Sequence, residues 1–140
     1  MTTEENKEII RCHWDELMNR HEAGKIEEFY APDVDNHTSH PSLPFGIESV
    51  NVIIPSLFAA VPDQKWEVEQ LVAEGDMVAC YVRWSGTHCG GTFREMEIPP
   101  GGRFSVEHVH LFRLAGGKIV EHWAVRDDLG MMQQLRADPE

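Results

Sequence analysis

The chain has few cysteines and few basic residues. Its 140 residues include only Cys12, Cys80 and Cys89, an odd number with no C-x-x-C spacing. This excludes a disulfide framework and a zinc ribbon, and a reducing cytoplasm is the expected compartment. With 12 Lys and Arg against 24 Asp and Glu, the net charge is −12. Because that charge repels phosphate backbones and anionic lipids, we expect neither nucleic acid nor a membrane as a partner.

Long apolar runs are also missing. No segment approaches the roughly 18 apolar residues that a membrane-spanning helix needs. The acidic stretch from Met1 to Lys7 lacks the basic and then apolar pattern of a signal peptide. Internal repeats and linkers do not occur either. Residues 1–140, of which 41% are hydrophobic, are therefore predicted to form a single domain with room for one small-molecule pocket.

Helical periodicity is present in the first half of the chain. Apolar residues recur at helical spacing over residues 2–21, and a capping box marks the start of that helix. A short second helix is expected near residues 26–30, followed by a loop over residues 34–45. A third helix is predicted to include residues 50–61, with a kink at Pro55.

The pattern changes to a period near two after residue 64. We expect strands joined by tight turns over residues 66–72, 77–88, 103–114 and 118–128, then a helical turn over residues 131–135. Helices followed by a run of antiparallel strands predict an α+β fold, in which a curved sheet packs against the helices. Such a sheet leaves an apolar pocket at its open end, with Trp14 and Leu17 buried beneath the first helix.

The last hairpin contains the candidate catalytic groups. If Gly116-Gly117 is a two-residue turn, His110 lies opposite Trp123 and His108 lies opposite Val125. Alternation then places Asp127 with these residues on an apolar wall, and Asp128 on the other face. Desolvation there would raise the pKa of Asp127, so Asp127 is the predicted general base and acid.

Two other interpretations of these residues remain open. Asp127 could instead end its strand and cap the helical turn that follows. His108 and His110 could chelate a metal ion with Glu121 or Asp127, but the pair has no third ligand at a fixed spacing, so we expect no metal. His37 lies in a polar segment between apolar elements, where pocket-lining side chains are often placed.

Several segments together resemble the SnoaL-like polyketide cyclases, also called ester cyclases, of the nuclear transport factor 2-like superfamily. The matching segments are Tyr30-Ala31-Pro32-Asp33 with Asn36-His37, the stretch from Leu71 to Asp76, the stretch from Gly117 to Trp123, and Asp127-Asp128-Leu129-Gly130 followed by Gln134-Leu135. The resemblance implies a cone-like curved antiparallel sheet whose N-terminal helices enclose a pocket, as in cystatin-like α+β barrels.

The resemblance also implies a cofactor-free intramolecular aldol ring closure. In this reaction an aspartate removes the proton α to a carbonyl and later protonates the new alkoxide; Asp127 is the matching position. We expect His108 or His110 to polarise or orient the carbonyl. Expected substrate-binding residues are His37, Trp123, Phe112, Trp14 and Phe58. The predicted partners are a hydrophobic small-molecule substrate and a second copy of the chain in a homodimer.

Two alternatives to the cyclase share the same fold. One is a non-catalytic module that binds a small ligand, in which Asp127 is structural. The other is a cofactor-free hydroxylase or isomerase. The fold by itself does not choose among these functions.

Overall fold

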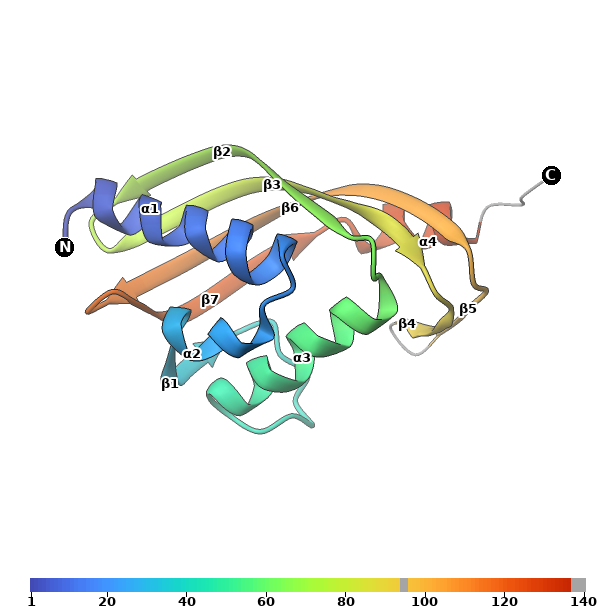
Figure 1. Cartoon of the computed structure of the whole chain (residues 1–140), viewed down its shortest axis with the longest axis horizontal. Helices are drawn as coiled ribbons and strands as arrows, with labels where there is room; N and C mark the ends of the chain where they lie inside the picture. The colour runs from blue at the N-terminus through green and yellow to red at the C-terminus, as the bar shows by residue number, and fades with distance from the viewer. Residues whose placement is uncertain (94–95, 137–140) are drawn as a thin grey trace.

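A curved five-stranded sheet forms the body of the protein, and the computed structural model describes residues 1–93 and 96–136 (Figure 1). The order of strands across the sheet is β1-β7-β6-β3-β2, with β1 parallel to β7 and every other neighbouring pair antiparallel. The bounds of these strands are β1 Tyr30–Asn36, β2 Lys65–Glu74, β3 Met77–His88, β6 Gly102–Ala115 and β7 Lys118–Arg126. A small separate two-stranded sheet pairs β4 (Gly91–Phe93) with β5 (Met96–Ile98).

The N-terminal helices lie along one face of this sheet (Figure 1). The first helix is α1 (Thr3–Cys12), which continues as a π-helical segment, η1 (His13–Asn19). The 3₁₀ turn η2 (Ala23–Lys25), α2 (Ile26–Phe29) and α3 (Ile47–Ala60) follow, and α4 (Asp128–Leu135) comes after the last strand. Within the described residues, no helix combines the length and the apolar character needed to cross a bilayer. The structure thus has the predicted α+β architecture, with helices against a curved, open sheet.

The core between the first helix and the sheet is as predicted. Thr2 and Glu5 form a capping box, in which each side chain bonds the backbone N–H of the other residue. Trp14 is 2% exposed and Leu17 is fully buried. Since burial of each large apolar side chain contributes about 1.5–3 kcal/mol, this stripe is a main support of the helix on the sheet.

The segment from Tyr30 to Asn36 differs from the prediction. It forms the edge strand β1, paired in parallel with β7, and not the end of a helix and the start of a loop. Pro32 within it has no N–H to donate, which an edge strand tolerates. The local pattern favoured a turn, whereas the pairing partner, β7, lies about 90 residues further along the chain.

A β-bulge in the β6–β7 hairpin changes which side chains share a face. The predicted two-residue turn is present, since Ala115 pairs with Lys118. After the next pair, Leu114 with Ile119, the register shifts by one residue. As a result, His110 lies opposite Ala124 and His108 lies opposite Arg126. A one-residue slip moves every later side chain to the other face of the strand. The predicted register is therefore wrong for the rest of β7.

Candidate functional site

The concave side of the sheet and the helices enclose a cavity of about 380 Å³. This volume lies in the range of small-molecule pockets. Its wall is mainly aromatic and aliphatic, with a small set of polar groups. The principal apolar side chains are Trp14, Val50, Ile54, Trp66, Trp84 and Phe112, and the principal polar ones are His13, His108, His110, His122, Arg126 and Asp128.

Three buried histidines of the cavity form a continuous hydrogen-bonded row. His108 Nδ1 lies 3.2 Å from His110 Nε2, and His110 Nδ1 lies 2.8 Å from His122 Nε2. His122 Nδ1 lies 3.0 Å from Asn36 Oδ1 at the end of β1. Strand alternation places His108 and His110 on one face of β6, and the bulge turns His122 of β7 toward them. We call these four residues the histidine relay.

Burial favours the neutral form of three of the cavity histidines, His13, His110 and His122. It lowers the pKa of His110 and of His122 well below the ordinary value, because charged imidazole loses its hydration, and the positive charge of Arg126 adds to the effect. Burial likewise lowers the pKa of His13 to about 3. His13 Nε2 lies 2.8 Å from the hydroxyl of Tyr30, whose own pKa is raised by burial.

Asp127 does not lie on the cavity wall. Its side chain is exposed, and its Oδ1 accepts a hydrogen bond of 2.8 Å from the N–H of Gly130, so that Asp127 caps the N-terminus of α4. The prediction that Asp127 faces the pocket is therefore wrong: the bulge inverts the alternation of β7, and the strand ends at Arg126, so that Asp127 is the N-cap of α4. Asp128, which was assigned to the opposite face, lines the cavity.

The other predicted site residues divide into two groups. Trp14, Phe112, His108 and His110 line the cavity. His37, Trp123 and Phe58 are not among its lining residues, so their predicted placement in the pocket is wrong. The His37 ring stacks on Trp123 with centroids 4.6 Å apart, on the face that the bulge turns away from the cavity, and Phe58 stacks on His21 with centroids 4.3 Å apart.

Comparison with known proteins decides the family. The model of the SnoaL-like polyketide cyclases matches residues 8–135. The chain belongs to this family. No curated protein gives a significant match.

Solved structures agree with the family assignment. TsrD from Streptomyces laurentii superposes with a TM-score of 0.86 at 24% identity, with 99% of both chains covered. A proposed SnoaL-like polyketide cyclase from Jannaschia sp. CCS1 has a TM-score of 0.82 at 27% identity, covering 98% of this chain and 95% of the other. AclR from Streptomyces galilaeus, a proposed hydroxylase, has a TM-score of 0.80 at 27% identity, and the match covers 99% of this chain and 85% of AclR. These structures share the nuclear transport factor 2-like fold.

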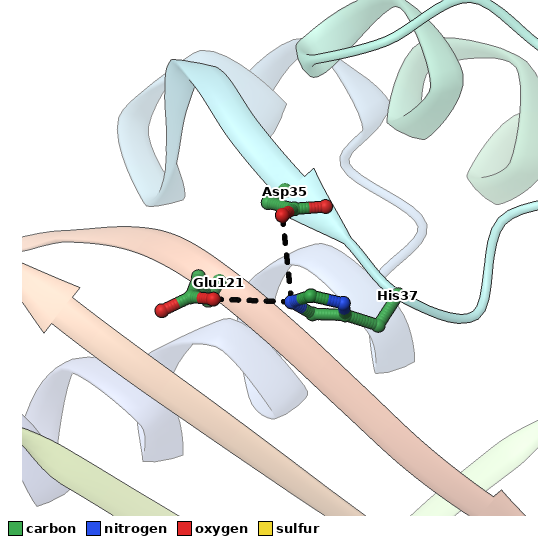
Figure 2. Close-up of side chains that lie close together, drawn as sticks. All are labelled: Asp35, His37 and Glu121. Atoms are coloured by element: carbon green, nitrogen blue, oxygen red, sulfur yellow. Dashed lines mark hydrogen bonds and ion pairs between the residues drawn. The ribbon is translucent and has the colours of Figure 1, made fainter.

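A cluster on the outer face of this SnoaL-like domain is the candidate for metal binding (Figure 2). Asp35, His37 and Glu121 bring one potential ligand atom each to within 4.8 Å of one another. His37 Nε2 lies 3.0 Å from Glu121 Oε2 and 3.5 Å from Asp35 Oδ2, while Arg113 Nε donates to Glu121 Oε1 at 2.8 Å. The contacts with His37 and Arg113 lower the pKa of Glu121. These contacts form a network of charged and polar groups that connects the end of β1 with β7 and β6.

The predicted metal alternative at His108 and His110 loses its proposed third ligands. Glu121 lies in the outer-face cluster, and Asp127 caps α4. The two imidazoles instead bond to each other. Among the described residues, the cavity brings together one carboxylate, one guanidinium and several imidazoles, and burial favours the neutral form of His110 and His122. This donor set suits proton transfer and the stabilisation of a developing oxyanion.

The sequence prediction overlooked the contribution of β7 to the cavity. The alternation that put Asp128 on the outer face also puts His122, Ala124 and Arg126 there, whereas the observed register turns this face of β7 toward the cavity. Their shared period was the available signal. The bulge at Val120 decides which of the two alternating sets of β7 side chains faces the cavity. No glycine at or next to Val120 marks this bulge in the sequence.

Proposed function

We propose that this SnoaL-like protein is a cofactor-independent enzyme that closes a ring in a polyketide-like small molecule by aldol chemistry. The observation that carries this proposal is the position of Asp128. It is the one carboxylate among the described residues that line the cavity. An activated carbon acid needs one base and a group that stabilises the enolate, so one carboxylate is enough.

Each step of the proposed reaction has a candidate group in the cavity. The Asp128 carboxylate takes a proton from the carbon α to a carbonyl, and the guanidinium of Arg126 meets the negative charge on the enolate oxygen. The enolate carbon then attacks a second carbonyl of the same molecule, forming the carbon–carbon bond. The new alkoxide takes the proton back from Asp128. No external oxidant or reductant enters this balance.

The walls of the cavity agree with a hydrophobic polycarbonyl substrate. The rings of Trp14 and Trp66 lie 5.0 Å apart, and Trp66 stacks on Trp84 at 5.0 Å with an angle of 12° between planes. Both Trp66 Nε1 and Trp84 Nε1 donate to Gln64 Oε1. The indoles of Trp66 and Trp84 are thereby held in place, and their apolar faces suit a flat, conjugated ligand.

We include in this proposal a homodimer that functions in the cytoplasm. Tyr81, Val109 and Val125 lie opposite one another on three adjacent strands of the outer face and are 37%, 44% and 75% exposed. An exposed apolar row of this kind favours burial against a second copy. The three cysteines are free, which agrees with a reducing compartment.

The test of the catalytic proposal is proton exchange at carbon. The probe is 1-tetralone, whose α-protons exchange slowly in neutral D₂O, and exchange is followed by proton NMR. The wild-type protein should accelerate the exchange, and Asp128→Asn should reduce that acceleration by about 10²–10⁴-fold. Asp127→Asn is the matched control, because asparagine is also a good N-cap, and should keep the acceleration. Equal rates in wild type and Asp128→Asn would contradict the assignment.

A second candidate function has one specific observation in its favour. AclR, at 27% identity, is a proposed hydroxylase. Oxygen consumption coupled to loss of an aromatic ligand would support hydroxylation in this chain. A protein that binds 1-tetralone without accelerating exchange and without consuming oxygen would instead be a binding module.

A further inference from the structure

Three side chains that can ligate a metal ion converge on the outer face of the sheet, away from the cavity (Figure 2). Asp35 and His37 are two residues apart, and the His37 backbone N–H continues the pairing of β1 by donating to His122 O at 2.9 Å. Strand alternation therefore points both side chains to the same side. Glu121 lies directly opposite Asp35 in the pairing of β1 with β7. None of the three is a lining residue of the cavity.

The spacing of the three ligand atoms suits a small divalent ion. His37 Nε2 lies 3.0 Å from Glu121 Oε2 and 3.5 Å from Asp35 Oδ2, and all three atoms lie within 4.8 Å of one another. Around an ion with bonds of about 2.0–2.1 Å, tetrahedral ligand atoms stand about 3.3–3.4 Å apart. The two distances from His37 fall on either side of this value. Because the Asp35 side chain is 47% exposed, its rotation can adjust the third distance.

The same arrangement suits either a proton or an ion at His37 Nε2. The oxygens of ionised carboxylates only accept hydrogen bonds, so a neutral His37 placed beside both of them holds its hydrogen on Nε2. A metal ion binds imidazole through a nitrogen lone pair, and the hydrogen then lies on Nδ1. An ion therefore takes the place of the Nε2 hydrogen, among the same oxygen atoms.

Negative charge exceeds positive charge around the cluster. Arg113 donates through Nε to Glu121 Oε1 at 2.8 Å and through Nη1 to Asp76 Oδ1 at 2.9 Å. This contact uses one oxygen of Glu121 and leaves Oε2 toward His37. Within the part of the chain that the structure describes, Asp35 pairs with no lysine or arginine. With a neutral imidazole, three carboxylates against one guanidinium leave two negative charges in excess, which a divalent cation balances.

Neighbouring groups hold the ligands in position. The His37 ring stacks on Trp123 with centroids 4.6 Å apart and 5° between the planes. The guanidinium of Arg113 orients the Glu121 carboxylate, as outer-shell partners do at metal sites. The ligands lie on two paired strands or directly after one, and such rigid elements fix ligand geometry better than loops do. Little rearrangement is therefore needed when an ion binds.

From this geometry we propose that Asp35, His37 and Glu121 bind one divalent cation of the zinc type, with water completing the coordination. One imidazole nitrogen and two carboxylate oxygens are ligands that Zn²⁺ accepts in a tetrahedral site. The site goes beyond the proposed function, because it lies outside the cavity and takes no part in the aldol chemistry.

The bound ion joins the end of β1 to β7. The register of these two strands shifts between Tyr30 and Asp35, so the ladder that holds the end of β1 is short. Asn36 lies between two of the ligands, and its Oδ1 lies 3.0 Å from His122 Nδ1. The ion therefore stabilises the folded protein and fixes the Asn36 end of the histidine relay.

The test is titration calorimetry with zinc chloride on protein that has been treated with a chelator and desalted. We expect one Zn²⁺ per wild-type chain. Asp35→Asn and Glu121→Gln keep the shape of the side chain, and His37→Phe keeps a ring against Trp123. Each should weaken binding by at least about 10–100-fold, the cost of losing even an outer-shell partner. His40→Gln is the matched control, since it removes another exposed histidine, and should keep the wild-type affinity.

The spectrum of bound Co²⁺ identifies the kind of ligand. Nitrogen and oxygen ligands in a tetrahedral site give visible d–d bands, whereas a thiolate adds a charge-transfer band in the near ultraviolet. This distinction matters because the cysteines are free and Cys89 is exposed. We expect the visible bands without the thiolate band in the wild type, and their loss in Asp35→Asn.

Stability gives an independent readout. Saturating Zn²⁺ should raise the urea midpoint of the wild type and leave that of His37→Phe unchanged, because a ligand stabilises only the state that binds it. Three results would overturn the proposal. They are no binding of Zn²⁺ to the wild type, equal affinities in the wild type and the three ligand variants, and a thiolate band in the Co²⁺ spectrum.

Discussion

The buried histidines predict that this protein loses stability in mild acid. In the unfolded chain, each imidazole titrates near pH 6.5. In the native state burial lowers the pKa of His13 to about 3 and those of His110 and His122 well below the ordinary value. Between these values the unfolded chain binds more protons than the native protein. The contribution of these histidines to the free energy of unfolding is therefore fully present above about pH 6.5 and is lost as the pH falls below that value.

The expected loss is large relative to the stability of a typical domain. Each histidine that stays neutral in the native state costs about 1.36 kcal/mol per pH unit below 6.5, which is about 2 kcal/mol at pH 5. If His13, His110 and His122 act independently, the loss in the free energy of unfolding at pH 5 is at most about 6 kcal/mol. A domain is usually stable by only about 5–15 kcal/mol. We expect the urea midpoint to fall steeply between pH 7 and pH 5, above the range where carboxylates titrate.

Substitution of His13 separates its share of the acid sensitivity from the shares of His110 and His122. His13→Leu removes one titrating group and the partner of the Tyr30 hydroxyl. Its stability at pH 7 therefore falls by about 1–3 kcal/mol. Its further loss between pH 7 and pH 5 should be smaller than that of the wild type by about 2 kcal/mol. The control is His40→Gln, at an exposed histidine bonded to Ser42, and should keep the wild-type dependence. Equal losses in wild type and His13→Leu would refute this reasoning.

Two further predictions concern packing and assembly. In Gly86→Ala, a Cβ atom would lie 2.4 Å from Val61 Cγ1 and 3.0 Å from Asp63 Oδ1, so we expect a loss of about 1–3 kcal/mol in urea unfolding, whereas Gly24→Ala, with no atom within 4 Å, should lose nothing. Similar losses in both variants would contradict the packing argument. Val109→Glu should shift a dimer to monomer in sedimentation velocity, because it places a charge within the exposed apolar row. A wild-type monomer at all concentrations would argue against the dimer.

The sequence by itself determined the elements and their local order. The apolar spacing of residues 2–21 predicted the first helix with Trp14 and Leu17 inside, and the alternation of residues 77–88 predicted a strand that the structure has with the same bounds. Both signals repeat several times within one segment, so they depend little on the rest of the chain. The matched segments were also enough to indicate the family, which the comparison of residues 8–135 confirms.

Tertiary structure decided which residues of those elements meet. Tyr30 to Asn36 became a strand only because β7 offers a partner far along the chain, and Asn36 thereby came within 3.0 Å of His122. The bulge in β7 and the start of α4 directly after that strand together placed Asp128, and not Asp127, at the cavity. A pattern of period two records which residues share a face of a strand, but it does not record which face is buried. That choice depends on a single-residue slip in the pairing with the neighbouring strand, and this slip is set by packing across the whole sheet.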